Sequence, residues 1–382
     1  MHSYPTSVAK WGLFEFQARG KTAGNPFTDY TVQGTFTSKN ETVTVSGFYD
    51  GEGIYKVRFM PSFEEAYTFT VSGSFFDETY GGSFLTTAPS SKNHGPVRAA
   101  NTYHFAYEDG TPYYPIGTTC YVWELQSDEQ IAKTLQSLKE AKFNKIRFCI
   151  FPKHYDYNLG EPRSYPYEGT PMDSSVLTKE NFLEYTGKTE GNHWDFTRFH
   201  PAHFQQIERC IAALQELGVE ADLIVMHPYD RWGFSQMTAE QDDLYWNYVI
   251  NRFSAYRNVW WALANEYDLM EHKTLADWER YAKLLCDHDP YGHLRSIHNS
   301  IPFTITADLG LRTAACSVWI CICLRNVQMP GEPGIRSRLC WMRSLMKAIF
   351  SMAGAIFPHK SCSDDFGRLS AAGDIPGTGR RI

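Results

Sequence analysis

The sequence lacks long apolar runs, Cys-x-x-Cys motifs and an excess of positive charge. No stretch of its 382 residues approaches the roughly 18–20 apolar residues that cross a membrane, so we expect no membrane partner. The net charge of −7 argues against nucleic acid as the main partner. Nine cysteines without a Cys-x-x-Cys motif suggest reduced thiols. Because no basic segment followed by an apolar one opens the sequence, we expect a cytoplasmic protein.

Tyrosine is missing from the last part of the chain. All 23 tyrosines lie in residues 1–300, and residues 301–382 contain none. The same tail holds five of the nine cysteines and carries a charge of +5, from ten Lys and Arg against five Asp and Glu, which leaves −12 for the rest. A single folded domain seldom changes its composition so sharply. We therefore predict that residues 304–382 form an aberrant and poorly ordered tail.

Short alternating segments fill residues 5–85. Turn residues separate them at the 8–12 residue spacing that is typical of an antiparallel sandwich. The pair Asp50-Gly51 predicts a hairpin turn, since both residue types tolerate a positive φ. We predict a small antiparallel β-sandwich over 5–85 and a polar linker over 86–98. The predicted strands are 11–17, 30–37, 41–49, 53–60 and 66–72.

From residue 99 onward, strands alternate with helices. The order predicts an α/β fold with a parallel sheet, and no glycine fingerprint of a dinucleotide-binding fold follows the first strand. Near-even spacing favours a (β/α)8 barrel over 99–303, with about five βα units present. The predicted strands are 115–123, 145–151, 221–227, 259–265 and 295–299, and a long loop follows the second of them. The predicted helices are 128–141, 202–217, 239–256 and 275–286, the second ending at Gly218.

Polar and aromatic residues stand at the ends of these strands. In a barrel the carboxyl ends of the strands meet on one face, so residues distant in sequence converge there. A Glu beside an Asn, with Trp and Arg nearby, suits cleavage of a glycosidic bond, which needs a proton donor and a second carboxylate. The strand-end residues are Trp123, Arg147, His227, Tyr229, Trp232, Asn265, Glu266, His298 and Asn299.

Several strings of the sequence match those of a known family. The matching strings are VAKWGLFE (8–15), GNPF (24–27), GFYDG (47–51), VRFMP (57–61), NHGPV (93–97), PIGTT (115–119) and WWALANE (260–266). Through them the chain resembles retaining glycoside hydrolases built on a (β/α)8 barrel, and within them the apiosidase-like bacterial family with an N-terminal immunoglobulin-like domain.

The resemblance implies roles for the strand-end residues. Glu266 would be the acid/base and Asn265 the hydrogen-bond partner of the sugar 2-hydroxyl, with Arg147 and His227 as supports. The substrate would be an oligosaccharide or glycoside, and we expect no cofactor. From their positions alone, we infer that Trp123 and Trp232 bind substrate as platforms on which the sugar stacks. The other predicted substrate-binding residues are Tyr229, His298 and Asn299.

The second carboxylate of a retaining mechanism is not found. In this clan it is a Glu that ends the seventh strand, and the one Glu of the tail, Glu332, has Pro and Gly on both sides, as in a turn. Read one base out of frame, residues 340–357 can encode LDEVPYEGNIQHGWGNI, a string with a strand-end carboxylate and the earlier aromatic composition. We hypothesise a frameshift close to residues 303–304, and we expect the chain to be impaired by loss of the nucleophile.

Other interpretations stay open. Glu266 could be a carboxylate that stabilises a helix N-terminus, and Arg147 could have a structural partner. The chain could be a non-catalytic carbohydrate-binding protein that uses Trp123, Tyr229 and Trp232. A metal-dependent hydrolase would need His227 with the histidines at 193, 200 and 203, whose spacing matches no compact ligand pattern, so we predict no metal. The sequence does not name the sugar or the oligomeric state.

Overall fold

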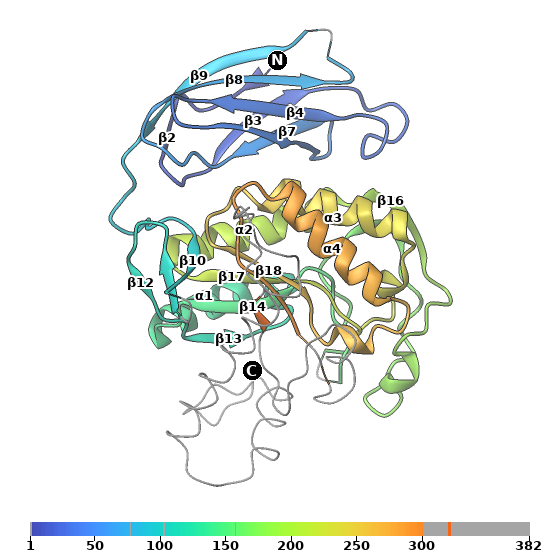
Figure 1. The fold of residues 1–382 in the computed structure, drawn as a ribbon. Coiled ribbons are helices and arrows are strands. Elements are labelled where there is room, and N and C mark those ends of the chain that lie inside the picture. Colours follow the sequence, from blue (N-terminus) through green and yellow to red (C-terminus); the bar gives the residue numbers. More distant parts are fainter. Residues whose placement is uncertain are drawn as a thin grey trace, which may run out of the picture.

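The computed structural model describes residues 2–76, 78–101, 104–156, 158–298 and 300, together with the backbone of residues 320–321. Figure 1 shows a β-rich N-terminal part, coloured blue to cyan, above an α/β part that carries helices α1 to α4. None of the described helices is both long and apolar enough to cross a membrane.

The N-terminal part consists of two sheets. Their orders are β1-β3-β7-β6 and β2-β9-β8-β4-β5, and the described pairings are antiparallel except that of β2 with β9. The first sheet contains β1 (His2–Ser3), β3 (Phe14–Arg19), β6 (Phe48–Tyr49) and β7 (Ile54–Phe59). The second contains β2 (Ser7–Ala9), β4 (Val32–Thr37), β5 (Thr42–Ser46), β8 (Ala66–Gly73) and β9 (Tyr80–Thr87).

Alternation along these strands creates a shared core. In β3, Phe16 and Ala18 are buried while Gln17 between them is exposed, as the two-residue period of a strand requires. Inward side chains of both sheets join in one cluster, in which the ring of Phe14 stacks on that of Phe84 with centroids 4.3 Å apart. The predicted turn is present between β6 and β7, where Gly51 has φ +90°. Three strands, β1, β2 and β9, were not predicted.

A small antiparallel sheet follows the N-terminal part. It has the order β10-β11-β12, formed by β10 (Val97–Ala100), β11 (His104–Tyr107) and β12 (Pro112–Tyr113). Val97 and Tyr113 pack against Trp260 and Leu294 of the α/β part. The predicted linker therefore overlaps the end of β9 and the start of β10.

The α/β part is built on a sheet with the order β13-β14-β17-β18-β19-β20. The first four pairings are parallel and the last is antiparallel. β17 and β18 are buried along their whole length, as expected for central parallel strands. The strands are β13 (Gly117–Thr119), β14 (Lys145–Cys149), β17 (Glu220–Met226), β18 (Val259–Ala264), β19 (Arg295–Ile297) and β20 (Ile320–Cys321).

Helices connect these strands. The α-helices are α1 (Asp128–Ala141), α2 (Pro201–Leu217), α3 (Ala239–Phe253) and α4 (Leu275–His288). The 3-10 helices are η1 (Trp123–Leu125), η2 (Phe182–Tyr185), η3 (Phe234–Gln236) and η4 (Tyr267–Leu269). Gly218 ends α2 in the left-handed region at φ +73°, as predicted. A capping box between Thr238 and Gln241 starts α3. The end of α2 and the start of α3 therefore both follow from local sequence.

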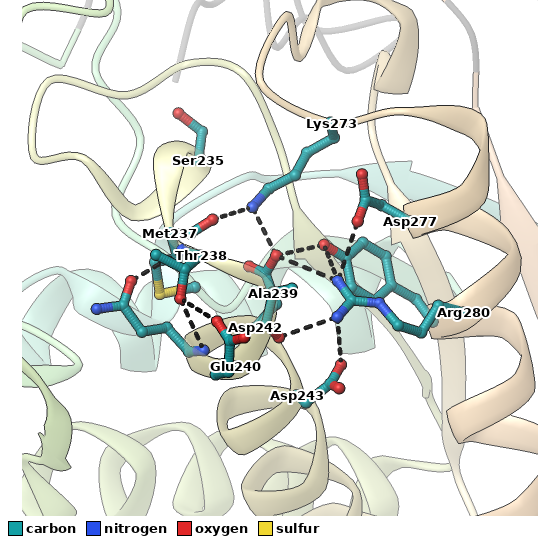
Figure 2. A network of polar contacts seen from close by, with 12 residues as sticks. Ser235, Met237, Thr238, Ala239, Glu240, Asp242, Asp243, Lys273, Asp277 and Arg280 are labelled. Carbon is teal, nitrogen blue, oxygen red and sulfur yellow. Dashed lines mark hydrogen bonds and ion pairs between the residues drawn. The ribbon is translucent and has the colours of Figure 1, made fainter.

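Helices α3 and α4 are joined by buried charges. Lys273, just before α4, donates to Asp242 of α3 and to the carbonyl of Met237, both at 2.6 Å (Figure 2). Arg280 of α4 reaches Asp243 at 3.1 Å, also shown in Figure 2. Since Lys273 and Asp242 are almost fully buried, each neutralises a charge that would otherwise be costly to bury.

A second buried network connects the N-terminal part with the α/β part. Arg252 of α3 donates to Asp50 at 2.7 Å and to Glu208 of α2 at 2.8 Å. Arg58 of β7 also donates to Glu208. The ring of Phe48 lies under both guanidinium groups, at 5.0 Å from Arg58 and 4.5 Å from Arg252. The two parts therefore share a desolvated ionic interface.

The α/β prediction is confirmed, and the predicted order of strands and helices in this part matches the observed one. Within the long loop after β14, however, the structure contains the unpredicted antiparallel pair β15 (Tyr167–Thr170) and β16 (His193–Phe199). The predicted domain boundaries, the immunoglobulin-like type and the closed or incomplete barrel stay predictions. Apart from the backbone of 320–321, the predicted tail 304–382 and its hypothesised frameshift lie outside the described residues.

Candidate active site

Asn265 and Glu266 follow the last residue of β18, at the carboxyl edge of the parallel sheet. The chain around them is fixed by backbone bonds to both neighbouring strand ends. The N–H of Asn265 donates to Met226 of β17 at 3.1 Å, and the N–H of His298, after β19, donates to Ala264 at 3.1 Å. Parallel pairing thus places the ends of β17, β18 and β19 side by side.

Glu266 has an unusual backbone. Its φ and ψ are both 53°, in the left-handed region that residues with a Cβ adopt at a cost. The half-buried carboxylate accepts a hydrogen bond from the hydroxyl of Tyr229. Strained residues of this kind cluster at functional sites because the surrounding structure must hold them in place. The backbone turn and Tyr229 together aim the carboxylate.

Asn265 is held from two sides. Its amide nitrogen donates to the hydroxyl of Tyr229 at 2.8 Å, and its amide oxygen accepts from Arg147 at 3.5 Å. Asn265 is buried, so its orientation is set by these partners. Tyr229 therefore bridges the predicted acid/base and the predicted orienting amide.

Arg147 has a strand partner. It lies on β14 and reaches Asp222 of β17 at 3.4 Å, and Asp222 also accepts from Lys145. Burial would raise the pKa of Asp222, but the charges of Lys145 and Arg147 hold it below its usual value. The structural interpretation of Arg147 is thus supported beside its contact with Asn265.

His227 lies beside Tyr229, and among the described residues no hydrogen bond joins it to Glu266. Burial lowers its pKa to about 3, so the ring is neutral and its Nε2–H donates to the carbonyl of Phe151 at 3.3 Å. The imidazole stacks on Tyr229 with centroids 5.6 Å apart. His227 therefore packs against the ring of Tyr229 on the side of the buried core.

Trp123 and Trp232 do not lie as a stacking platform requires. They are 2% and 1% exposed, and their rings pack in the core against Phe148 and Phe234 respectively. A sugar can stack only on a ring face that solvent reaches. The prediction of two tryptophan platforms is therefore corrected: both are core residues here.

His298 lies near Arg147 and Asp268. Burial first, and then the charge of Arg147, lowers its pKa to about 4. Asn299, the other predicted binding residue at this strand end, lies outside the described residues.

Sequence reasoning missed a lysine next to Glu266. Lys153, in the loop after β14, is buried, and the rings of Tyr121, Tyr155 and Tyr229 surround its Nζ. The three tyrosines are half-buried and follow the carboxyl ends of β13, β14 and β17. The string KHYDY (153–157) directly after a buried strand was the available signal, and its lysine was passed over as a loop residue.

Known families were compared with the chain. Residues 99–319 match the family described as "Apiosidase-like, catalytic domain", and residues 7–74 match a domain of unknown function, DUF5060. The first of these matches covers more than half of the 382 residues. The chain belongs to the apiosidase-like family.

Solved structures agree with this family assignment. The apiosidase-like chain is 40% identical to a candidate glycoside hydrolase from Bacteroides vulgatus ATCC 8482, with a TM-score of 0.70 over 78% of this chain and 56% of that one. The apiosidase-like chain thus spans little more than half the length of that protein. By family and fold it is homologous to glycoside hydrolases.

Two more distant solved structures are matched with lower identity and TM-score. A glycoside hydrolase family 5 protein from Bacteroides vulgatus ATCC 8482 is 13% identical, with a TM-score of 0.38 over 54% of this chain and 40% of that one. An endo-1,4-beta-D-mannanase from Thermotoga petrophila RKU-1 is 17% identical, with a TM-score of 0.30 over 48% and 55%. No curated protein matches the apiosidase-like chain.

The histidines considered as metal ligands have different surroundings. His203 is buried, and its Nε2 bonds the carbonyl of Ile150 at 2.9 Å while Nδ1 lies 3.0 Å from the hydroxyl of Ser164. His193 is exposed on β16. In the described part of this apiosidase-like chain, no three His, Cys, Asp or Glu side chains are grouped to hold a metal ion.

Proposed function

We propose that the chain is a retaining glycoside hydrolase by descent, with Glu266 as acid/base. The observation that carries the proposal is the hydrogen-bonded set Glu266, Tyr229, Asn265 and Arg147 at the carboxyl edge of the sheet, in an apiosidase-like chain. In (β/α)8 enzymes the chemistry lies at this edge. The proposed substrate is an O-glycoside of a plant or bacterial oligosaccharide.

The proposed mechanism assigns one role to each residue. In a complete retaining site, Glu266 gives a proton to the glycosidic oxygen while the second carboxylate bonds the anomeric carbon and the protonated leaving group departs. In the second step Glu266 takes a proton from the water that displaces that carboxylate from the anomeric carbon. Asn265, held by Arg147 and Tyr229, donates to the sugar 2-hydroxyl. Hydrogen bonds to that hydroxyl strengthen in the transition state, so a fixed amide lowers the barrier.

The nucleophile is the missing part of this proposal. A retaining pair has its carboxyl groups about 5–5.5 Å apart. The sequence position where the clan carries the nucleophile falls in 304–382, outside the described residues. We therefore propose that this chain hydrolyses glycosides poorly or not at all.

The architecture belongs to the same proposal. It comprises an immunoglobulin-like β-sandwich over 5–85, a linker over 86–98, an incomplete TIM-type barrel over 99–303 and a frameshifted tail over 304–382, in a cytoplasmic protein. The facing antiparallel sheets and the five adjacent parallel strands support the first and third of these units. Sequencing the locus across residues 303–304 tests the last: a single frame that encodes the tail would contradict the frameshift.

A non-catalytic carbohydrate-binding protein is the second candidate. The half-buried rings of Tyr121, Tyr155 and Tyr229 beside Glu266 favour it, since a partly exposed aromatic ring can contact a sugar without any chemistry. This candidate needs Asn265 and Tyr229 but no nucleophile.

Calorimetry and product analysis on one panel of aryl glycosides test both candidates. We expect the wild-type chain to bind at least one glycoside and to release little product. Glu266→Gln should weaken this binding, whereas the control Glu129→Gln, at an exposed position of α1, should not. Turnover that is lost in Glu266→Gln would confirm the acid/base role and contradict the impaired state. A wild-type chain that binds no glycoside would overturn both candidates.

A further inference from the structure

Lys153 places a buried ammonium inside a cage of tyrosine rings. Its Nζ lies 3.5 Å from the ring centre of Tyr121, 4.1 Å from that of Tyr229 and 4.4 Å from that of Tyr155. We call Tyr121, Tyr155 and Tyr229 the tyrosine cage. Lys153 is 2% exposed, so the rings replace much of the water that would otherwise surround the charge.

The tyrosine cage is connected to Glu266 by one of its members. Tyr229 presents its ring to Lys153 and donates its hydroxyl to Glu266, while the same hydroxyl accepts from Asn265 at 2.8 Å. Tyr121 and Tyr155 each meet Tyr229 edge to face, with centroids 6.2 and 6.0 Å apart. A displacement of Tyr229 would therefore move both polar groups of the proposed site.

A buried cation is costly unless neighbouring groups stabilise it. The side chain of Lys273, which is 2% exposed, is neutralised by Asp242 in the network between α3 and α4 (Figure 2). The ammonium of Lys153 lies among the rings of the tyrosine cage, next to the residue proposed to meet the sugar. Its contact with Tyr229 therefore adjoins the proposed site.

We propose that Lys153 is a positioning residue for Glu266: its ammonium fixes the ring of Tyr229 so that the Tyr229 hydroxyl holds the Glu266 carboxylate and the Asn265 amide in register. The position of Tyr229 is set by the cation through its ring and is transmitted through its hydroxyl. The inference rests on the proposed function in that Glu266 is taken as the residue that meets the substrate.

The surroundings of Lys153 predict a titration that reports this link. Burial lowers its pKa to about 8, and the neighbouring Cys149, Glu266 and Asp156 partly oppose that effect. Cys149 faces it from β14, Asp156 from its own loop and Glu266 from the end of β18, while neutral His227 stacks behind Tyr229. Loss of the proton near this pH should release the ring of Tyr229.

A ligand-free experiment reads the link directly. In the full chain with isotope-labelled tyrosine, the NMR resonance of the Tyr229 phenol carbon is assigned with Tyr229→Phe. We expect this resonance to shift with a midpoint near the lysine pKa of about 8 in the wild type and in Lys273→Met. It should not titrate in Lys153→Met. A Tyr229 resonance that stays constant in the wild type over this range would overturn the inference.

Binding then tests the positioning role. For the aryl glycoside that the wild type binds most tightly, Lys153→Met should raise Kd about thirtyfold, the size of a desolvated cation–π contact. Lys153→Arg, which keeps the charge, should restore most of the affinity, and Lys273→Met should leave Kd unchanged. Equal affinity of Lys153→Met and wild type would overturn the inference. If no glycoside binds the wild type, the proposed function fails, and the Tyr229 titration alone decides whether Lys153 positions that ring.

Discussion

Two buried glutamates show how the pKa of the same side chain depends on its partners. Glu124, in η1 after β13, is fully buried, and its carboxyl oxygens have no hydrogen-bond partner among the described residues. Burial holds its pKa well above the usual value. Glu208 is also buried, yet it accepts from Arg58 and Arg252, whose charges outweigh burial and hold its pKa below the usual value. The sequence alone does not distinguish these two residues.

Replacement of Glu124 by methionine should stabilise the protein. The pKa of Glu124 is raised in the folded protein, so folding is least disfavoured by this residue below the unfolded pKa of 4.5, where the carboxyl is neutral in both states. As pH rises above 4.5, the unfolded chain ionises first, and the wild type loses free energy of unfolding. We expect Glu124→Met to raise the free energy of unfolding by about 1–3 kcal/mol at pH 8, and by less at pH 5. Urea denaturation at both pH values measures this. A variant less stable than the wild type at pH 8 would contradict it.

The matched change Glu208→Met should have the opposite effect. It leaves Arg58 and Arg252 buried with one partner fewer, which costs about 3–5 kcal/mol. Because the pKa of Glu208 is lowered, its contribution is present above pH 4.5 and is lost as pH falls further. The deficit of the variant, measured in urea, should therefore shrink in acid. A deficit that does not change with pH would show that packing, not charge, sets the cost.

Regular elements in this chain follow from local sequence. α1 starts and ends at the predicted residues, and the side chain of Ser127 caps it by accepting from the N–H of Gln130. The apolar strings of β17 and β18 gave those strands correctly to within one residue at each end. β15 and β16 were missed because their pairing joins segments about 25 residues apart in a long loop. The alternation along β16 was a local signal that the sequence prediction did not use.

Gly218 allows a test of how local sequence ends a helix. It ends α2 at φ +73°, and nothing lies within 4 Å of the place where a Cβ would be added. Gly218→Ala should therefore cost only the left-handed conformation, about 1–2 kcal/mol of unfolding free energy. Gly160, which has equal space but no positive φ, provides the control, and Gly160→Ala should change little. Equal urea midpoints for the two variants would contradict the assignment.

On the scale of the whole molecule, the N-terminal and α/β parts are tied by desolvated charges. Arg252 contacts Asp50 and Glu208, and Tyr291 of the α/β part packs into the core cluster of the two N-terminal sheets. Burial opposes the charge of Asp50, but Arg252 and Lys56 keep its pKa below the usual value. The interface therefore resembles a domain core more than a surface contact.

The two parts should accordingly unfold together. We expect one transition in scanning calorimetry for the wild type, and either two transitions or a loss of about 3–5 kcal/mol for Arg252→Met, which leaves Asp50 without its arginine. Arg19→Met, an exposed arginine at the end of β3, is the control and should keep the wild-type profile. Separate transitions in the wild type would show that the interface does not couple the parts.

The sequence by itself determined the order of strands and helices in the α/β part and the position of Asn265–Glu266 after a buried strand. These depend on apolar periodicity and turn residues, which act within one segment. Only the tertiary structure decided that Tyr229 bridges Glu266 and Asn265, that Lys153 lies in a tyrosine cage, and that Trp123 and Trp232 are core. These facts depend on contacts between segments as far apart as Lys153 and Tyr229, and burial or hydrogen bonding at that range leaves no periodic trace in the chain.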